Sequence, residues 1–481
     1  MTQTIIKPYI KCLDIEIDAQ GFFNQVLYHK EQAFWLDNPS NDQDQCGEWS
    51  YLGCPEGPHA KVLTYWQAKK QLQIQQGGQE STETVTTIFS YLKTQQHIKE
   101  VTGIPSPFKG GYIGYFGYEL RGDNLPSSHY ESEFPDAYLF YCDRFIAINH
   151  RTQKTYLICR DLSDQQQRAL TWIEETLEQI NLSSKPTRKA NNKAEKTRLA
   201  NNIEDKMRIK KDTYLDYIQQ CQEWIKDGQA YQLCLCNQLS IPNIHQDLRE
   251  VYATLRQNNP SPYSACFKTK ELTILSLSPE CFLRVSATGR VTTKPIKGTI
   301  ARKVDPKEDE KQQKTLQNNP KERAENTMIV DLLRNDLAKV SQAGSVTVDA
   351  YLSIESYATV HQLVSTVSSQ LAAGKDIYDL LKATFPGGSM TGAPKARAIA
   401  LLEELEQGPR GPYSGCLGWM SDDGASHLSI VIRSIIANKN CLKIGVGGGI
   451  THQSIPEMEW EELKIKAQCL YQAITNKHHA L

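Results

Sequence analysis

The chain has 481 residues and a formal net charge of −1, with 54 Lys and Arg residues against 55 Asp and Glu. This balance creates no field that would attract nucleic acid or an anionic membrane. No apolar run reaches the length of about 18 residues needed to span a membrane, and the first residues lack the apolar core of a signal peptide. The 13 cysteines are scattered, with no Cys-x-x-Cys pair, which is typical of reduced thiols in a cytoplasmic protein.

Residues 1–182 are predicted to form an N-terminal region of short strands and turns. Apolar runs at residues 138–142, 145–148 and 155–159 are typical of strands. Between residues 110 and 117, glycines alternate with aromatic residues, a pattern that fits either a phosphate-binding loop or close backbone packing. We favour close packing, because the segment lacks the Gly-Lys-Ser/Thr ending of a phosphate loop.

Residues 183–203 are polar, basic and nearly free of apolar side chains. This composition predicts a linker or loop that leads into a second region, residues 204–481. A nucleic-acid-binding tail is the alternative, but the lack of interleaved aromatic residues argues against it.

The second region begins with a predicted helix, followed by a strand at residues 231–241 that carries Gln232. A further apolar run ends in Ser-Pro-Glu, so Glu280 is expected at a strand boundary. The runs at 281–285 and 291–294 then predict a hairpin, with Lys297 just past its second arm. A single lysine in a chain of this size is most often a surface charge.

Two predicted helices, within residues 321–336 and 456–466, each place paired carboxylates on one face, because the glutamates recur at three-residue spacing. Two such faces could bind Mg²⁺, which takes few protein carboxylates and keeps several waters. The alternative is a pair of solvated helix faces with salt bridges. The residues concerned are Glu322 and Glu325 in the first helix, and Glu459, Glu462 and Lys466 in the second.

Three segments between these helices could bind anions. Residues 385–397 form a loop of small residues before a helix, where backbone N–H groups and the Ser389 hydroxyl could receive an anion. Residues 430–433 predict a strand that carries Arg433, whose guanidinium suits a carboxylate. Residues 444–450 predict a strand–glycine turn, which either forms an anion nest or simply permits tight packing.

Residues from about 210 to 475 resemble the chorismate-utilising enzymes, a family that includes anthranilate, aminodeoxychorismate, isochorismate and salicylate synthases. Eight landmarks occur in the order found in this family, which is very improbable by chance. Residues 1–180 resemble the family's N-terminal region, through residues 34–37 and 110–120. The landmarks are residues 278–280, 295–299, 324–336, 388–397, 413–418, 432–433, 447–449 and 456–467.

Two positions indicate the branch of the family. The members that add water have a catalytic lysine where this chain has Gln232, so the resemblance implies the ammonia-using branch. In the motif at residues 295–299, anthranilate synthases have alanine, whereas aminodeoxychorismate synthases have lysine, as Lys297 here. The resemblance therefore implies an enzyme that aminates chorismate at C4 to give 4-amino-4-deoxychorismate, a precursor of 4-aminobenzoate and folate. Anthranilate synthase component I and a non-catalytic chorismate-binding protein stay open as alternatives.

The same resemblance implies three catalytic residues. Lys297 would attack C2 of chorismate and form a covalent adduct before ammonia enters at C4. An attacking lysine must be deprotonated, so its pKa is expected below the usual value of about 10.4. Glu280 would act as the acid, and Gln232 would occupy the position that distinguishes ammonia from water.

Metal-binding and substrate-binding positions are also implied by the family pattern. Mg²⁺ would bind the ring carboxylate of chorismate and stabilise charge as the hydroxyl leaves. Its direct ligands would be Glu325 and Glu462, with Glu322 and Glu459 acting through water. The substrate-binding positions would be Thr299, Gln362, Ser389, Tyr413, Arg433, Gly447, Gly448, Gly449 and Lys466.

Two departures from the family pattern concern the site. Gln362 stands where many relatives have a histidine that assists loss of the hydroxyl. His361 is its neighbour, and on a strand it would point to the opposite face. Cys234 replaces a common asparagine. The residue that protonates the leaving hydroxyl is therefore not fixed by the resemblance.

The resemblance implies an α+β fold in which two antiparallel β-sheets pack as a sandwich with helices outside. The ammonia would come from a separate glutamine amidotransferase subunit, component II, because no glutaminase pattern is seen in this sequence. Relatives have a tryptophan pocket near residues 34–40. The usual Leu-Glu-Ser is altered here to Leu36, Asp37 and Asn38, so we make no prediction of feedback control.

Overall fold

The structure is a computed structural model that describes residues 6–38, 48–95, 101–121, 125–183, 203–243, 246–357 and 360–475. Within these ranges, no helix combines the length and the apolar character needed to cross a membrane. The predicted linker at residues 183–203 lies outside the described residues except for its first and last positions.

The first sheet has 11 strands, and each of its paired neighbours is antiparallel. Strands from the N-terminal region form one side, and strands from the second region form the other. In spatial order the strands are β1 (Ile6–Leu13), β10 (Lys154–Leu162), β9 (Arg144–Asn149), β3 (Trp49–Gly53), β2 (Ala33–Asp37), β12 (Tyr263–Lys268), β13 (Thr273–Ser278), β22 (Ser434–Ala437), β23 (Cys441–Ile450), β11 (Gln232–Pro242) and β19 (Gly392–Ala393).

The second sheet has 12 strands and is antiparallel in the same way. It also combines the two regions of the chain, which meet where β7 pairs with β20. In spatial order its strands are β16 (Ile296–Ala301), β18 (Val360–Gln370), β15 (Arg290–Lys294), β14 (Cys281–Val285), β21 (Ser426–Ile430), β20 (Cys416–Ser421), β7 (Gly111–Phe116), β8 (Ala137–Cys142), β4 (Lys61–Trp66), β5 (Gln71–Gln76) and β6 (Gln79–Thr84), with β17 (Thr347–Ser356) paired to β18.

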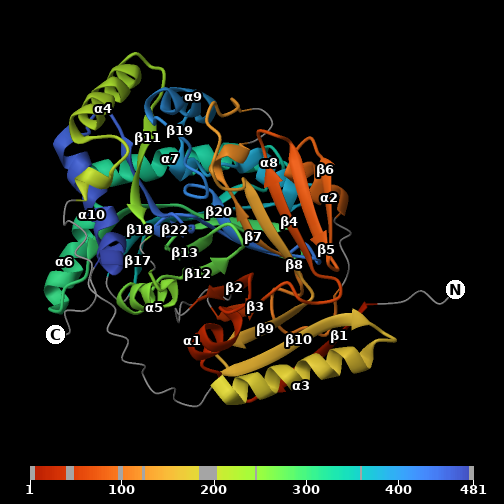
Figure 1. Cartoon of the computed structure of the whole chain (residues 1–481). Coiled ribbons are helices and arrows are strands. Elements are labelled where there is room, and N and C mark those ends of the chain that lie inside the picture. The colour runs from red at the N-terminus through yellow and green to blue at the C-terminus, as the bar shows by residue number, and fades with distance from the viewer. Residues whose placement is uncertain are drawn as a thin grey trace.

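The two sheets pack face to face (Figure 1). Aromatic side chains fill the core between them. The ring of Phe140 on β8 lies 4.6 Å from that of Phe267 on β12, and the ring of Tyr51 on β3 lies 6.1 Å from that of Trp419 on β20. Burial of such large apolar surfaces is the main stabilising term of the sandwich. The predicted fold, two packed antiparallel sheets with helices outside, is confirmed.

The glycine-rich segment of the N-terminal region lies inside the second sheet. A Cβ atom on Gly114 of β7 would stand 2.0 Å from the carbonyl oxygen of Tyr138, so only glycine lets these strands approach. The close-packing interpretation of this segment is therefore confirmed, since β7 is paired on both edges.

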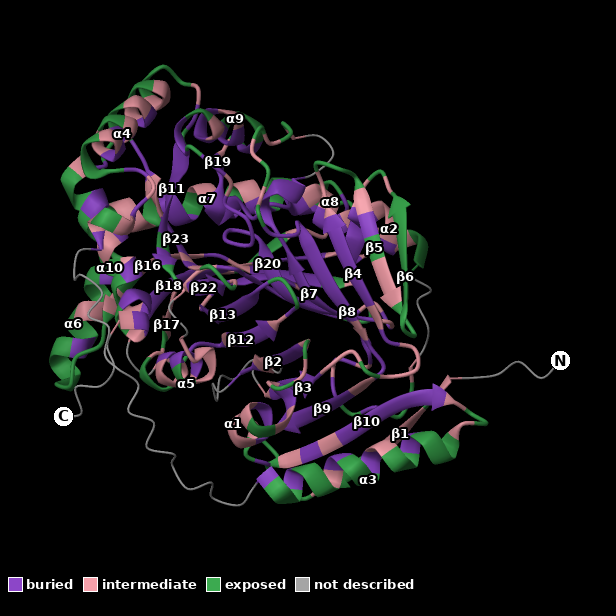
Figure 2. Cartoon of the chain, in the orientation of Figure 1, coloured by how far each residue is buried: buried purple, intermediate pink, exposed green. Residues whose placement is uncertain are grey.

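Helices cover the outer faces of both sheets, as Figure 1 shows. Those packed on the first sheet bury one stripe and expose the other, and α3 shows this alternation clearly in Figure 2. Helices on the first sheet are α1 (Ala19–Phe22), α3 (Gln166–Ser183), α4 (Lys211–Lys226), α5 (Leu248–Asn258), α9 (Lys395–Leu405) and α10 (Pro456–Thr475). Beside the second lie α2 (Ile88–Gln95), α6 (Pro306–Gln317), α7 (Pro320–Ala338) and α8 (Ile377–Thr384). Short helical turns are η1 (Phe23–Leu27), η2 (Tyr118–Leu120), η3 (Glu204–Lys206) and η4 (Gly388–Met390).

Candidate active site

Lys297 follows the β14–β15 hairpin, as expected, and lies on the short strand β16 at one end of the second sheet. The next residue, Gly298, has φ +84°, and a Cβ atom there would stand 3.0 Å from a carboxylate oxygen of Glu322. Glycine is therefore required for β16 to pass close to α7. This approach brings Lys297 Nζ to 3.7 Å from Glu325 Oε2.

The electrostatic environment of Lys297 differs from the expected one. Burial lowers the pKa of Lys297, but Glu325, together with Cys234, Glu280 and Glu322, raises it, and the net pKa lies above the ordinary value. The prediction of a lowered pKa is therefore wrong for the protein without ligands. The reason is that the acidic groups contributed by α7 and the β13–β14 junction outweigh desolvation.

Glu280 lies between β13 and β14, at the predicted strand boundary, and is buried. Burial raises its pKa from 4.5 to about 7, although a hydrogen bond with Ser389 and the charge of Lys297 oppose the rise. Ser389 belongs to η4, more than one hundred positions along the chain, so the fold brings together two residues that the sequence placed on separate motifs. The carboxyl of Glu280 is half protonated near neutral pH and can act as a proton donor.

Helix α7 presents the first pair of carboxylates. It begins at Pro320, where the side chain of Asn319 accepts from the first backbone N–H groups. Glu325 is buried and accepts a hydrogen bond of 3.2 Å from Nε2 of Gln232 on β11. The Oε1 atom of Gln232 is buried and has no hydrogen-bond partner among the described residues, so it can accept from a bound molecule.

Helix α10 presents the second pair of carboxylates. Glu459 accepts from Lys321 Nζ at 2.9 Å and from Ser454 Oγ at 2.7 Å. Glu462 pairs with Lys466 at 2.8 Å, and Lys466 also donates to the carbonyl oxygen of Gly447 at 2.8 Å. Lys321 thus connects α10 to α7, where it lies 3.9 Å from Glu325.

The four glutamates face one another across these two helices. Burial raises the pKa of Glu325 against the opposing charges of Lys297 and Lys321, and the charges of Glu459 and Glu462 raise it further. Burial and Glu325 likewise raise the pKa of Glu322, whereas Lys466 holds that of Glu462 below its ordinary value against the effect of burial. Across the described ranges, no three Asp, Glu, His or Cys side chains are close enough together to hold a metal ion. The lysine salt bridges predicted as the alternative are therefore present on these helix faces, and the magnesium site stays a prediction.

Two of the predicted anion-binding segments have a different local structure. The strand predicted at residues 430–433 is wrong, because β21 ends at Ile430 and Arg433 occupies a bend with φ +52° before β22. The glycine turn is also wrong, because Gly447, Gly448 and Gly449 lie within β23 and pair with β11. Pairing of β23 with β22 stops at Ile444, so the glycine stretch keeps one unpaired edge.

The glycines of β23 let side chains approach the strand closely. A Cβ atom on Gly449 would stand 2.1 Å from Nε2 of Gln232, and one on Gly448 would stand 3.2 Å from Glu459 Oε2. The buried ring of Tyr413 packs against Gly445, where a Cβ atom would stand 2.0 Å from the ring. The Tyr413 hydroxyl accepts from the Cys236 thiol at 3.9 Å. The fold thus gathers the β23 glycines, Gln232 and the α10 carboxylates in one place.

The remaining predicted residues lie on the β16–β18 pair. Thr299 is exposed and stands opposite Gln362. Gln362 is buried, and its Oε1 atom has no hydrogen-bond partner among the described residues. His361 points to the other face, as expected, where its ring nitrogens contact Ser356 Oγ at 2.7 Å and Asp309 Oδ1 at 2.9 Å. It therefore cannot replace the histidine absent at position 362.

Sequence reasoning missed two parts of the site. Lys321 was detectable, because it stands one helical turn before Glu325. The buried ion pair Glu406–Arg410 behind the site could not be detected from the sequence, because its hydrogen-bond partners come from segments far apart in the chain.

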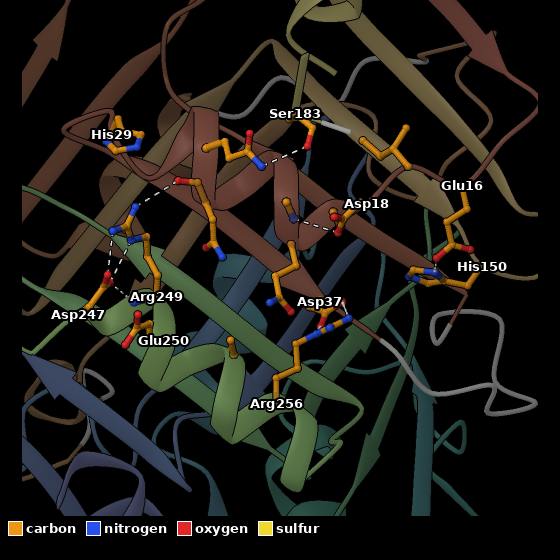
Figure 3. Close-up of a pocket in the computed structure, with 17 residues that line it drawn as sticks. Glu16, Asp18, His29, Asp37, His150, Ser183, Asp247, Arg249, Glu250 and Arg256 are labelled. Carbon is orange, nitrogen blue, oxygen red and sulfur yellow. Dashed lines mark hydrogen bonds and ion pairs between the residues drawn. The ribbon is translucent and has the colours of Figure 1, made fainter. Parts of the chain in front are cut away.

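A large cavity of about 1210 Å³ lies elsewhere, beside α1 and α5 (Figure 3). Its walls contain ion pairs between Arg249 and Asp247 and between Arg256 and Asp37. A small cavity of about 50 Å³ lies beside Leu36, Asp37 and Asn38. Neither cavity is lined by a residue of the predicted site.

A sequence profile described as chorismate binding enzyme matches residues 31–472. The aminodeoxychorismate synthase of Streptomyces pristinaespiralis is 36% identical over 96% of this chain and 64% of its own length. Aminodeoxychorismate synthase component 1 of Escherichia coli (strain K12) is 35% identical over 74% of this chain and 75% of its own length. The crystal structure of anthranilate synthase component I from Streptococcus pneumoniae TIGR4 is 28% identical, with a TM-score of 0.71 over 90% of this chain and 93% of that chain. The chain spans 50% to 64% of the lengths of four longer relatives of the aminodeoxychorismate synthase type.

Proposed function

The chain belongs to the chorismate binding enzyme family, and from this premise we propose that it aminates chorismate at C4 to give 4-amino-4-deoxychorismate. The observation that carries the proposal is the position of Lys297, whose amine stands beside the carboxylate of Glu325 and within electrostatic reach of the protonatable Glu280. The names of the relatives support the same reaction.

In the proposed reaction, Lys297 first loses a proton to solvent, a step that its raised pKa makes dependent on pH, and its neutral Nζ then forms a bond to C2 of chorismate while the two ring double bonds shift. The C4 hydroxyl leaves as water with a proton supplied by Glu280. Ammonia then adds at C4, returns a proton to Glu280, and the bond between C2 and Nζ breaks. The net change is chorismate plus ammonia to 4-amino-4-deoxychorismate plus water. A pKa of Glu280 of about 7 suits both proton transfers.

Substrate carboxylates have a suitable partner in Arg433. Arg433 occupies the bend between β21 and β22, and its planar guanidinium can bind a carboxylate through two parallel bonds. We assign the same role to Lys466, to Tyr413 and to the backbone of Gly447, Gly448 and Gly449. The hydroxyls of Ser389 and Thr299 and the amide of Gln362 complete the proposed substrate-binding set.

We propose that a divalent cation binds at the carboxylates of α7 and α10, although their described side chains do not form a ready-made site of three or more ligands. Burial and mutual repulsion raise the pKa values of Glu322 and Glu325, so a cation there would relieve unfavourable charge. Hard oxygen donors of this kind suit Mg²⁺. We propose Glu325 and Glu462 as direct ligands and Glu322 and Glu459 as residues that act through water. When bound, Mg²⁺ would neutralise negative charge at the ring carboxylate of the substrate.

The source of ammonia is proposed to be a separate glutamine amidotransferase. The name of the E. coli relative, component 1, supports a second component. Free ammonium at high concentration would replace this partner in the assay. Activity with glutamine alone would require the partner protein to be added.

The deciding experiment is a product assay with chorismate, Mg²⁺ and ammonium at alkaline pH, followed by mass spectrometry. We expect a product that keeps the enolpyruvyl side chain and has an amine in place of the C4 hydroxyl. Anthranilate and pyruvate would contradict the proposal. They would favour anthranilate synthase component I, the function of the solved neighbour. Binding of chorismate without turnover would indicate a non-catalytic protein.

A further inference from the structure

A buried arginine behind the site has all five of its N–H groups bonded. Arg410 follows α9, and Glu406, which caps the C-terminal end of that helix, accepts from Nε at 2.7 Å and from Nη2 at 2.6 Å. Nη2 also donates to the Cys234 carbonyl at 3.0 Å. Nη1 donates to the Met390 carbonyl at 2.7 Å and to Ser414 Oγ at 3.3 Å. Guanidinium has five donors in a fixed plane, so this set of acceptors fixes its orientation completely.

The partners of Arg410 lie beside the proposed active-site residues. Met390 follows Ser389 on η4, and Ser414 follows Tyr413. Cys234 lies two positions after Gln232 on β11 and contributes to the charge around Lys297. The carboxylate of Glu406 adds a bond of 3.0 Å from the Cys236 N–H group on the same strand. A single ion pair thus holds three segments that are distant in sequence.

The N-terminal region encloses this ion pair from the other side. The ring centroid of Tyr118 on η2 lies 4.2 Å from the Arg410 guanidinium carbon, a cation–π contact. Glu119 is buried, and its carboxylate accepts from the backbone N–H groups of Arg410 at 2.8 Å and Gly411 at 3.0 Å. The Tyr118 N–H group donates to the Gly411 carbonyl at 2.9 Å.

We propose that Arg410, oriented by Tyr118 and Glu119 of the N-terminal region, is a positioning residue that sets the mutual placement of the Ser389, Gln232 and Tyr413 segments. This inference rests on the proposed function. It gives the glycine-rich segment that ends in η2 a role in the reaction, although none of its residues belongs to the proposed substrate-binding set.

The chemistry of the network favours a positioning role over a purely stabilising one. Replacing a buried ion pair by apolar residues of similar volume is often neutral or stabilising, because desolvation of the two charges is costly. A network that only stabilised the fold would therefore be poorly served by Arg410 and Glu406. The hydrogen bonds to the Met390 and Cys234 carbonyls fix the orientation of both backbone segments, which apolar packing alone does not do.

The chain offers a matched control for this role. Arg121 is also buried, also lies over the Tyr118 ring, with its guanidinium carbon 5.3 Å from the centroid, and also pairs with a glutamate, Glu403. Its other hydrogen-bond acceptor among the described residues is the Pro126 carbonyl, so it bonds none of the three active-site segments. The variants Arg410→Lys and Arg121→Lys therefore make the same chemical change in neighbouring ion pairs.

The experiment compares wild type, Arg410→Lys and Arg121→Lys in chorismate turnover with ammonium, in thermal unfolding and in amide hydrogen exchange. For Arg410→Lys we expect kcat/KM for chorismate to fall about 10- to 100-fold, the cost of a misplaced reacting group, with faster exchange at residues 388–391. The Mg²⁺ concentration for half-maximal rate should stay unchanged, because α7 and α10 carry the metal-binding carboxylates and neither contacts Arg410. Arg121→Lys should keep kcat/KM within about twofold despite a comparable loss of thermal stability.

The outcomes separate this inference from the proposed function. Equal kcat/KM and equal exchange in the two variants would overturn the positioning role. If the wild-type protein forms no product from chorismate, the proposed function fails, and the exchange of residues 388–391 still tests Arg410. Should Arg410→Lys not fold, Glu119→Gln weakens the same network from the N-terminal side, and its effect on kcat/KM should again exceed that of Arg121→Lys. An activity equal to that of wild type would contradict the inference.

Discussion

Two clusters of charged side chains on this molecule differ in how their charges are balanced. In the large cavity beside α1 and α5, hydrogen bonding to Arg249 lowers the pKa of Asp247, and Asp247 in turn raises the pKa of Arg249 (Figure 3). In the proposed active site, burial and neighbouring carboxylates raise the pKa values of Glu322 and Glu325, and that of Glu280 rises to about 7.

The volume of the cavity beside α1 and α5 is therefore not by itself evidence of a reactive site. The cavity beside α1 and α5 contains charges that already stabilise one another. A charged ligand that entered it would therefore gain little electrostatic free energy. In the active site, the pKa values of Glu280, Glu322 and Glu325 stay raised despite the nearby lysines, and these three carboxyl groups are the ones that a cation, a proton or a substrate can relieve. If this distinction is right, substitutions of the active-site charges should change turnover far more than substitutions in the wall of the cavity.

Removal of the proposed nucleophile should have the largest effect. Lys297→Ala is expected to reduce the rate of chorismate amination by about 10³-fold or more, because the covalent route is lost. Product analysis by mass spectrometry should be made at the same time, since anthranilate could appear in its place. Lys294→Ala is the matched control, because Lys294 also pairs with a glutamate, Glu355, at 2.8 Å. Unchanged rate and product in Lys297→Ala would exclude the covalent role.

Removal of one proposed metal ligand should have the next largest effect. Glu325→Gln is expected to lower the rate about 100-fold and to raise the Mg²⁺ concentration for half-maximal activity at least about tenfold. It should also move the pH profile of Lys297 to lower pH, because Glu325 is the first of the acidic groups that raise its pKa. Glu355→Gln, in the Lys294 pair, should leave all three quantities unchanged. A variant with normal Mg²⁺ dependence would refute the assignment of Glu325.

The ionised carboxylate of the buried Glu280 should make the protein less stable at high pH than at low pH. The pKa of Glu280 rises from 4.5 to about 7 on folding, so its protonated form stabilises the folded state fully below pH 4.5, and this contribution disappears as the pH passes through about 7. Glu280→Gln should therefore gain stability relative to wild type between pH 5 and pH 8, by up to about 3 kcal/mol at 1.36 kcal/mol per pH unit. Urea unfolding at both pH values measures the difference. A constant difference would contradict the raised pKa.

A substitution in the wall of the large cavity should have the smallest effect on stability, and this effect should depend on pH in the opposite direction to that of Glu280. Asp247→Asn keeps the N-terminal cap of α5 but removes the ion pair with Arg249. Because this pair is partly exposed, we expect a loss of only about 0.2–1 kcal/mol at neutral pH. The lowered pKa of Asp247 means that the loss should vanish as the pH falls through the folded-state value. Chorismate turnover should stay within about twofold of wild type. A large loss of turnover would show that the comparison of the two clusters is wrong.

Local patterns in the sequence predicted the elements that carry the site. Strand periodicity located β8, β9, β10 and the boundary at Glu280, and three-residue spacing placed Glu322 and Glu325 on one face of α7. These features follow from backbone geometry, in which side chains repeat every 2 residues on a strand and every 3.6 on a helix. The same rule predicted that His361 faces away from Gln362.

Features that depend on distant partners were not predictable in this way. The bend at Arg433 and the continuous strand through Gly447, Gly448 and Gly449 were both misjudged, because isolated apolar and glycine runs do not reveal which edges are paired. The Arg410 network was missed entirely, because its acceptors lie on three separate segments.

The sequence by itself therefore determined which residue types were available at the site and on which face of each element they lie. The tertiary structure alone decided the protonation of those residues and the placement of their segments. The raised pKa of Lys297 shows why. It is the balance between burial and charges from Glu325, Cys234 and Glu280, which lie on different elements, and such a balance depends on distances in space that no local pattern encodes.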